Sequence, residues 1–351
     1  MKILKYILIL IAIILIGFAL YVALEPDHYK VTRSQTIQAP PSVIDNYITD
    51  YRKWTQWSPW ESQDPNAAIE YGDPASGPEG SYSWNGEVLG KGSMKTLFIS
   101  PDSILQEIKF IEPYESRADV FWTLDSVAEG TEVTWGMEGD LSFTERAFMV
   151  FQGDMNTLIG PDYERGLNNL DSLVTADMQA YSIEIIGETT YGGGYYMYKT
   201  AGSSTQQVDE VAAPLFEDVE AYMENNNISS SGNPFLLIEK WDEENMSAII
   251  SASIPVTDRV ITTPGSEILC GFQESGMYFK SRLTGHYDNL EEAWTKTEEA
   301  LKAAGYMIDP GAKPFEVYLN DSDQLPNPAE WKTEIYVPVK KAPDAGMEDQ
   351  T

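Results

Sequence analysis

The chain has 351 residues, long enough for two domains, and its 42% hydrophobic and 12% aromatic content is that of a folded protein rather than a disordered one. Its 55 acidic and 23 basic side chains give a formal net charge of −32, which repels phosphate backbones, so we expect no nucleic-acid partner and interpret the acidity as solubility or adaptation to salt. One cysteine, Cys270, and two histidines, His28 and His286, exclude an intramolecular disulfide and leave little material for a zinc site, so we expect no metal and no cofactor.

The first predicted element is a membrane-spanning helix over residues 3–24, which are apolar apart from Lys5. At about 1.5 Å per residue this stretch extends roughly 33 Å, enough to cross a hydrocarbon core of about 30 Å. Lys2 and Lys5 at its start are expected to keep the N-terminus in the cytoplasm. We therefore predict a single-pass anchor over residues 1–28, with the soluble domains outside the cytoplasm. A cleaved signal peptide is the alternative, although the stretch does not end in a typical small-residue cleavage site.

Residues 29–176 are predicted to form an antiparallel sheet followed by a long helix. Apolar and polar residues alternate in segments separated by glycine and proline turns, and no crossover helix fits between these segments. The alternation is clearest in residues 132–141, where Val133 and Trp135 are expected to face inward. The predicted strands are 31–37, 81–84, 94–99, 104–111, 118–124 and 132–141, with a short helix over 43–49.

After the last of these strands, the spacing of apolar residues changes to that of an amphipathic helix with a break at Gly160 and Pro161. The face expected to be buried consists of Phe148, Phe151, Met155, Leu158, Ile159, Tyr163, Leu167, Leu170 and Leu173. A curved sheet followed by such a helix predicts an α+β domain with a cavity between the two.

These residues resemble the START-like, polyketide-cyclase-like (SRPBCC) superfamily, a helix-grip fold, over about residues 31–174. The resemblance is carried by Trp54-Thr55-Gln56-Trp57-Ser58-Pro59-Trp60, by Gly90-Lys91-Gly92 and by Gly130-Thr131-Glu132-Val133-Thr134-Trp135. It implies a space between sheet and helix that takes lipids, sterols or other hydrophobic small molecules. For the tryptophans themselves we prefer a simple core role, because aromatic side chains in a meander are ordinarily buried.

The remaining domain, residues 179–341, repeats itself at an offset of about 80 residues. Three short motifs recur in both copies, and an amphipathic helix lies between the first and the second motif of each copy. Each copy is therefore predicted to be strand–helix–strand–strand, and the sheets of the two copies are expected to pair. The landmark pairs are Tyr198-Lys199-Thr200 with Phe279-Lys280-Ser281, Pro234-Phe235 with Pro314-Phe315, and Ile254-Pro255-Val256 with Val337-Pro338-Val339.

This pattern resembles the GyrI-like domain, the effector-binding module of many bacterial AraC-type and MerR-type regulators, over about residues 181–340. The matching motifs are Gly285-His286-Tyr287, Phe315-Glu316-Val317-Tyr318 and Glu334-Ile335-Tyr336-Val337-Pro338-Val339. The resemblance implies that a cleft between the two copies binds small molecules, often aromatic and cationic, against a carboxylate. It assigns ligand binding to Glu316, Glu334 and Tyr336, and less directly to Tyr287, Trp294 and Tyr318. An anchor and a START-like domain stand where such regulators carry a DNA-binding head, so we do not expect a transcription factor.

The last two predicted strands each contain a Glu-x-Tyr sequence, Glu316 to Tyr318 and Glu334 to Tyr336. Because side chains alternate along a strand, we expect both pairs to lie on one kind of sheet face, opposite the apolar residues, as the floor of an aromatic, anionic pocket. A carboxylate among rings has a raised pKa unless a cation compensates it, and each cation–π contact adds about 0.5–2 kcal/mol. A solvated sheet surface is the alternative interpretation.

The sequence therefore predicts a membrane-anchored, extracytoplasmic protein that binds a hydrophobic or cationic aromatic small molecule. One alternative is a hydrolase in which Glu334 or Glu316 acts as an acid/base with Tyr336. Another is a structural envelope protein whose pockets are filled by its own side chains. Binding is favoured over catalysis, and residues 342–351 are predicted to be a frayed tail.

Overall fold

The computed structural model describes residues 2–321 and 324–342, and these divide into two compact units that meet between Asp177 and Met178. The fold is α+β, as predicted. The predicted tail lies outside the described residues except for Ala342.

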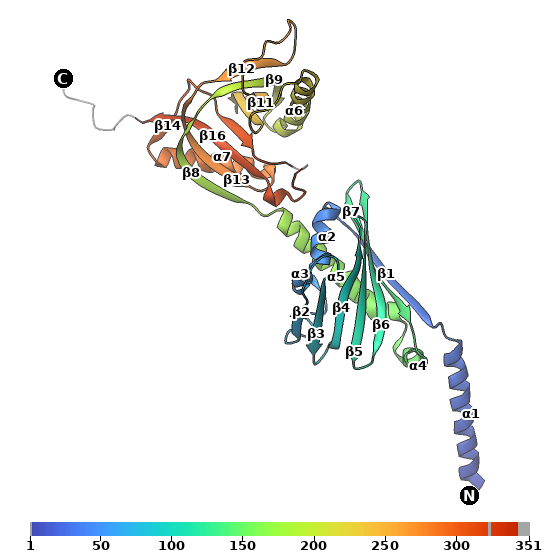
Figure 1. Ribbon diagram of the computed structural model, residues 1–351. Coiled ribbons are helices and arrows are strands. Elements are labelled where there is room, and N and C mark those ends of the chain that lie inside the picture. Colours follow the sequence, from blue (N-terminus) through green and yellow to red (C-terminus); the bar gives the residue numbers. More distant parts are fainter. Residues whose placement is uncertain (1, 322–323, 343–351) are drawn as a thin grey trace, which may run out of the picture. The chain divides into compact units, whose positions relative to one another are not determined.

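Unit 1 contains one antiparallel sheet of seven strands in the order β1-β7-β6-β5-β4-β3-β2 (Figure 1). Strands β3 to β7 form the predicted meander, and the unpredicted strand β2 adds to its edge beside β3. Strand β1 joins the sheet by pairing with β7, so that His28 lies opposite Asp140. The strands are β1 (His28–Ile37), β2 (Ala68–Tyr71), β3 (Ser81–Gly86), β4 (Gly90–Ile99), β5 (Ser103–Glu112), β6 (Ser116–Val127) and β7 (Gly130–Asp140).

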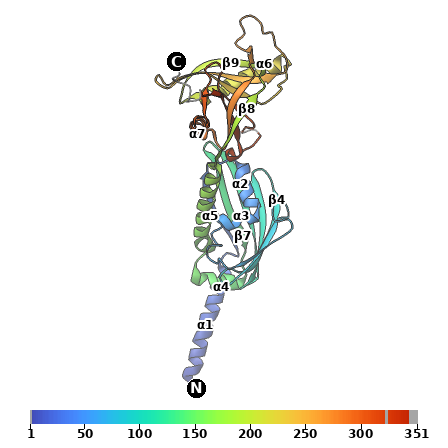
Figure 2. The same cartoon turned by 90° about the vertical axis from the view of Figure 1, so that its left-hand side faces the viewer.

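The helices of unit 1 are α1 (Lys2–Leu24), α2 (Pro41–Thr49), α3 (Tyr51–Trp57), α4 (Phe143–Gln152) and α5 (Met155–Met178). Helix α5 packs along the sheet through Tyr163, Leu167 and Leu170, which gives the predicted helix-grip arrangement (Figure 2). Residues 3–24 of α1 are long and apolar enough to cross a membrane and are almost wholly exposed, a result that fits an anchor or a signal sequence equally.

The helical region after β7 differs from the prediction. It breaks at Gly153, whose φ of +96° favours glycine, whereas α5 continues through Pro161. The expected inward face is correct for Tyr163 and Leu167, but no residue of α4 is buried, so the expectation that Phe148 and Phe151 enter the core is wrong.

Unit 2 contains a sheet of nine strands whose order confirms the predicted duplication. The order β12-β9-β11-β10-β15-β16-β13-β8 is symmetric about its centre: β12, β9, β11 and β10 in one half of the sheet correspond to β8, β13, β16 and β15 in the other. Strand β14 adds to β16. The two copies join where β10 pairs with β15. The strands are β8 (Ser182–Tyr191), β9 (Gly194–Ser204), β10 (Phe235–Asp242), β11 (Ser247–Val256), β12 (Leu269–Gln273), β13 (Gly276–Thr284), β14 (Tyr306–Ile308), β15 (Phe315–Tyr318) and β16 (Lys332–Lys341).

The helices of unit 2 pack on one face of this sheet, which we call the helix face. They are α6 (Val208–Asn225) in copy one and α7 (Leu290–Ala303) in copy two, with short 3-10 turns at η1 (Tyr287–Asn289) and η2 (Pro328–Glu330). Helix α6 covers Leu236 and Ile250, and α7 covers Ile335 and Val337. The opposite face, which we call the ring face, carries a buried aromatic core of its own.

Candidate functional site

The two Glu-x-Tyr sequences lie on opposite faces of the unit 2 sheet. In the β15–β16 ladder, Phe315 pairs with Tyr336 and Val317 pairs with Glu334. Because directly paired residues point to the same side, Glu334 and Tyr336 lie on the ring face, whereas Glu316 and Tyr318 lie on the helix face. The expectation of one shared floor is therefore wrong.

On the helix face, the carboxylate of Glu316 lies beneath α7 and is 6% exposed. The indole Nε1 of Trp294 donates a hydrogen bond to Glu316 Oε1 at 2.5 Å, and the hydroxyl of Tyr318 donates to Oε2 at 2.9 Å. Within the described ranges no lysine or arginine forms an ion pair with Glu316. Its two partners are neutral, so the negative charge is hydrogen-bonded but not compensated.

Half-buried rings surround this carboxylate. The ring of Tyr318 meets those of Phe216 and Tyr287 edge-on, with centroids 5.7 and 5.5 Å apart, and Tyr287 lies 5.0 Å from Trp331. Phe216 comes from α6 in copy one, whereas the other rings come from copy two. We refer to Glu316, Trp294, Tyr318, Tyr287, Phe216 and Trp331 as the Glu316 cluster.

The electrostatic surroundings of the Glu316 cluster are acidic. Burial raises the pKa of Glu316 to about 7, although the hydrogen bonds from Trp294 and Tyr318 oppose this rise. Burial and then the carboxylates of Asp321, Glu316 and Asp209 raise the pKa of Tyr287 to about 12. These acidic groups around aromatic rings make the cluster attractive to a cation.

On the ring face, Glu334 has a different environment because two cations hold it. Lys280 Nζ lies 2.7 Å from Glu334 Oε2, Arg282 Nη2 lies 2.6 Å from Oε1, and the hydroxyl of Tyr336 donates to Oε2 at 3.0 Å. Burial alone would raise the pKa of Glu334, but these hydrogen bonds outweigh it and the pKa is lowered. Lys280 Nζ also lies 5.0 Å from the centre of the Tyr336 ring. An incoming cation would meet a carboxylate that is already paired.

The rings of the ring face pack against one another. Phe315 and Tyr336 stack with centroids 4.8 Å apart, and Tyr191 contacts both of them. Phe315 and Tyr278 are fully buried, and Tyr191 and Tyr336 are partly exposed at the rim. This face is a closed aromatic core with an ion-paired margin.

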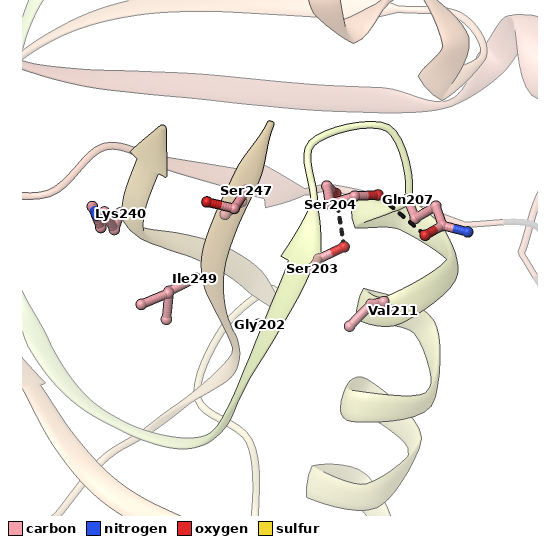
Figure 3. A pocket seen from close by; sticks show the side chains of 9 residues that line it. Gly202, Ser203, Ser204, Gln207, Val211, Lys240, Ser247 and Ile249 are labelled. Atoms are coloured by element: carbon pink, nitrogen blue, oxygen red, sulfur yellow. Dashed lines mark hydrogen bonds between the residues drawn. The ribbon is translucent and has the colours of Figure 1, made fainter. Parts of the chain in front are cut away.

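A depression of about 460 Å³ lies elsewhere in unit 2, where the ends of β9 and β11 pair beside the start of α6 (Figure 3). Three of its polar side chains already have partners: Ser204 Oγ donates to Gln207 Oε1 at 3.1 Å, and Lys240 pairs with Asp242, which lies outside the lining. It presents no uncompensated charge comparable to Glu316. Its lining residues are Gly202, Ser203, Ser204, Gln207, Val211, Lys240, Ser247, Ala248 and Ile249.

A group of buried rings lies in the interior of unit 1. Trp122, Trp135 and Tyr163 stack in series between the sheet and α5, with centroids 4.5 and 4.0 Å apart. Trp54 and Trp57 meet this stack edge-on, and all five side chains are at most 1% exposed. These rings occupy the part of the expected cavity that lies next to α5.

Comparisons with known families agree with this architecture. Residues 28–175 match the family model described as polyketide cyclase/dehydrase and lipid transport, and residues 196–340 match the model described as a GyrI-like small molecule binding domain. The chain joins a polyketide-cyclase-like domain to a GyrI-like domain. Domains of these two families imply small-molecule binding. No curated protein matches the chain.

Three solved structures illustrate the fold likeness. The C-terminal domain of EcmrR is 18% identical, covers 46% of this chain and 99% of its own, and has a TM-score of 0.37. Protein SA2116 of unknown function from Staphylococcus aureus is 14% identical, covers 44% and 99%, and has a TM-score of 0.36. The Zhui aromatase/cyclase from Streptomyces sp. R1128 is 13% identical, covers 44% and 97%, and has a TM-score of 0.34. At these values the likeness is weak and does not bear on ligand or mechanism.

The six residues predicted for the GyrI-like domain fall into two groups. Glu316, Tyr318, Tyr287 and Trp294 come together on the helix face, and Glu334 and Tyr336 lie apart from them on the ring face.

Sequence reasoning missed five further residues: Phe216, Asp209, Trp331, Lys280 and Arg282. A signal for the last two was present, because Lys280 and Arg282 alternate on one strand as Glu334 and Tyr336 do on its partner. Phe216 and Asp209 carried no such signal, since only the folded chain brings α6 beside copy two. Among the residues described, no group of three or more His, Cys, Asp or Glu side chains could hold a metal ion.

Proposed function

We propose that this protein is a membrane-anchored small-molecule-binding protein whose GyrI-like domain takes an aromatic cation at the Glu316 cluster. The observation that carries the proposal is a buried carboxylate that has two neutral donors and, among the residues that the structure describes, no cationic partner, and that is surrounded by half-buried rings. A bound cation compensates the charge of Glu316, and ring faces such as that of Tyr287 add about 0.5–2 kcal/mol each.

The charge distribution supports this location over the ring face. At Glu334 a cationic ligand has to displace Lys280 and Arg282, whereas at Glu316 it displaces no charged group. In unit 1 stacked rings occupy the space next to α5 and offer no uncompensated carboxylate, so we assign the ligand to unit 2.

Catalysis is less well supported than binding. An acid/base pair working near neutral pH needs pKa values close to that pH. The pKa of Glu334 is lowered and that of its partner Tyr336 is raised by burial, so both move away from neutrality. Glu316 has a pKa of about 7, but it lies on the opposite face of the sheet from Tyr336 and so does not form an acid/base pair with it.

The proposed membrane attachment uses α1, with both units outside the cytoplasm. Its 22-residue apolar stretch is 6% buried and therefore free to meet lipid. Lys2 and Lys5 lie at the N-terminal end of the stretch, and Glu25 and Asp27 follow it, which favours that orientation.

The binding proposal is tested by calorimetry on the full chain with benzyltrimethylammonium and its uncharged isostere neopentylbenzene. We expect the cation to bind at least about tenfold more tightly, which corresponds to about 1.4 kcal/mol. Its affinity should rise as pH increases through about 7, because Glu316 must lose its proton to pair with the cation.

The matched variants are Glu316→Gln and Glu334→Gln. The first should abolish the preference for the cation, and the second should leave it intact because Glu334 lies on the other face of the sheet. Equal affinity for the two ligands, or a cation preference that survives in Glu316→Gln, contradicts the proposal.

A further inference from the structure

An apolar surface lies at one end of unit 1, centred on α4. At about 100° per residue, Phe143, Ala147, Phe148, Val150 and Phe151 of α4 fall on one side of the helix, whereas Met149 lies on the other. None of them is buried, and Phe148 and Phe151 are 57% and 76% exposed. A cluster of large exposed apolar side chains of this kind marks an interaction surface rather than a water-facing one.

Two turns of the sheet extend this surface. Val88, in the β3–β4 turn, is 68% exposed, and Tyr114, in the β5–β6 turn, is 74% exposed. Strand pairing places both turns at the end of the sheet from which α4 begins. The pairs that show this are Gly86 with Gly90, Lys91 with Glu112, Phe110 with Ser116, and His28 with Asp140.

Helix α1 leaves unit 1 at this same end and touches α4 (Figure 2). The rings of Phe18 and Phe151 have centroids 5.6 Å apart, and Arg146 Nη1 donates a hydrogen bond to the carbonyl oxygen of Glu25 at 3.1 Å. Phe18 precedes the end of α1 at Leu24 by six residues, or about 9 Å along the helix axis. The exposed aromatic face of α4 therefore lies at a level inside the apolar stretch of α1.

We propose that α4 and the two turns dock on the surface of the bilayer that α1 crosses, with Phe148 and Phe151 at the border of the acyl chains. The inference rests on the proposed anchor, because α1 sets the level of the membrane. Interfacial helices bury their apolar side roughly 5–10 Å into the boundary between headgroups and acyl chains. This depth agrees with the position of Phe151, which contacts Phe18 about 9 Å along the axis from the end of α1.

The partner is lipid because the membrane-spanning segment itself touches the surface through Phe18. Exposed carboxylates, including Glu115 and Asp140, flank the surface. Insertion of apolar side chains, rather than attraction to anionic headgroups, therefore keeps this surface on the membrane. A bilayer whose headgroups carry no net charge is sufficient. The consequence is a second contact that fixes the orientation of unit 1 on the membrane.

The test places a nitroxide label at single positions of the full chain in phosphatidylcholine nanodiscs, in a Cys270→Ser background that removes the chain's one cysteine. Phe148→Cys and Phe151→Cys probe α4, and Tyr114→Cys probes a turn whose replacement leaves α4 unchanged. Ile11→Cys reports whether α1 lies in the bilayer. Ala128→Cys, exposed in the β6–β7 turn at the other end of the sheet, reports full exposure to water.

We expect labels at positions 148 and 151 to collide more with oxygen than with a water-soluble nickel chelate, with position 114 intermediate and position 128 dominated by the chelate. If the label at position 11 lies in the bilayer while 148, 151 and 114 behave like 128, the docking proposal is overturned and the anchor stands. If position 11 is also in water, the anchor itself fails, and the docking proposal with it.

Discussion

Replacing Glu316 by glutamine should stabilise the GyrI-like domain at alkaline pH, although it removes a hydrogen-bonded side chain. Burial raises the pKa of Glu316 from 4.5 to about 7, so the folded protein holds this proton more tightly than the unfolded chain. The contribution of protonated Glu316 to the free energy of unfolding is fully present below about pH 4.5. It is lost as the pH rises to about 7, at about 1.36 kcal/mol per pH unit. The loss amounts to roughly 3 kcal/mol in total.

Glutamine keeps a carbonyl oxygen to accept from Trp294 or Tyr318 but carries no charge. We therefore expect Glu316→Gln to resemble the native protein at pH 5 and to exceed its stability by about 2.5 kcal/mol at pH 8. The measurement is hydrogen exchange of α7 and β15 peptides in urea, read by mass spectrometry, which isolates the unfolding of unit 2.

Glu334→Gln is the matched control, because it changes the same side chain on the other face of the sheet. It leaves Lys280 and Arg282 without their shared carboxylate, and the expected loss at pH 8 is on the order of 2 kcal/mol. This estimate is below the usual cost of breaking a buried pair because Arg282 is 34% exposed. If the two variants change stability in the same direction at pH 8, the assignment of an uncompensated Glu316 and a compensated Glu334 is refuted.

Three further variants test particular contacts. Trp135→Ala should cost unit 1 about 3–5 kcal/mol, measured by urea unfolding, because it removes the centre of the ring stack; a loss below 1 kcal/mol contradicts that packing. Tyr318→Phe removes a hydrogen-bond donor to Glu316 and should therefore raise the pKa of this carboxyl further. In the same exchange assay, folding stability should then go on falling to a higher pH than in the native protein. Lys280→Met should raise the pKa of Glu334, so that the loss of folding stability on acidification is complete at a higher pH than in the native protein. An unchanged dependence of stability on acid pH rules out this pairing.

The meander of unit 1 and the duplication of unit 2 followed from the sequence because local patterns determine them. Alternation and turn residues located the meander of unit 1, and paired landmarks such as Lys199 and Lys280 located the duplication. Edge strands β8 and β12 and the short strands β2 and β14 lacked these signals and were not predicted.

The faces of the two Glu-x-Tyr sequences could not be obtained in this way. Alternation fixes which residues of one strand share a side, but it does not say which residue of the next strand lies opposite. Pairing Phe315 with Tyr336 rather than with Ile335 exchanges the faces of one strand relative to the other.

Helical spacing left a similar ambiguity after β7. An apolar side at that spacing is expected whether a helix packs on a core or on lipid, and Phe148 and Phe151 were assigned to the core. The break at Gly153 and the contact between Phe18 and Phe151 depend on the folded chain.

The ring stack of unit 1 also gives this chain an optical signature. Trp122, Trp135 and Tyr163 lie nearly parallel at 4.5 and 4.0 Å, so their electronic transitions couple and should produce a strong near-ultraviolet circular dichroism signal. Six of the nine tryptophans, those at positions 54, 57, 60, 84, 122 and 135, lie in unit 1. Loss of the coupled signal thus reports the unfolding of this unit in the intact chain, and the melting of the two units can be followed separately without any label.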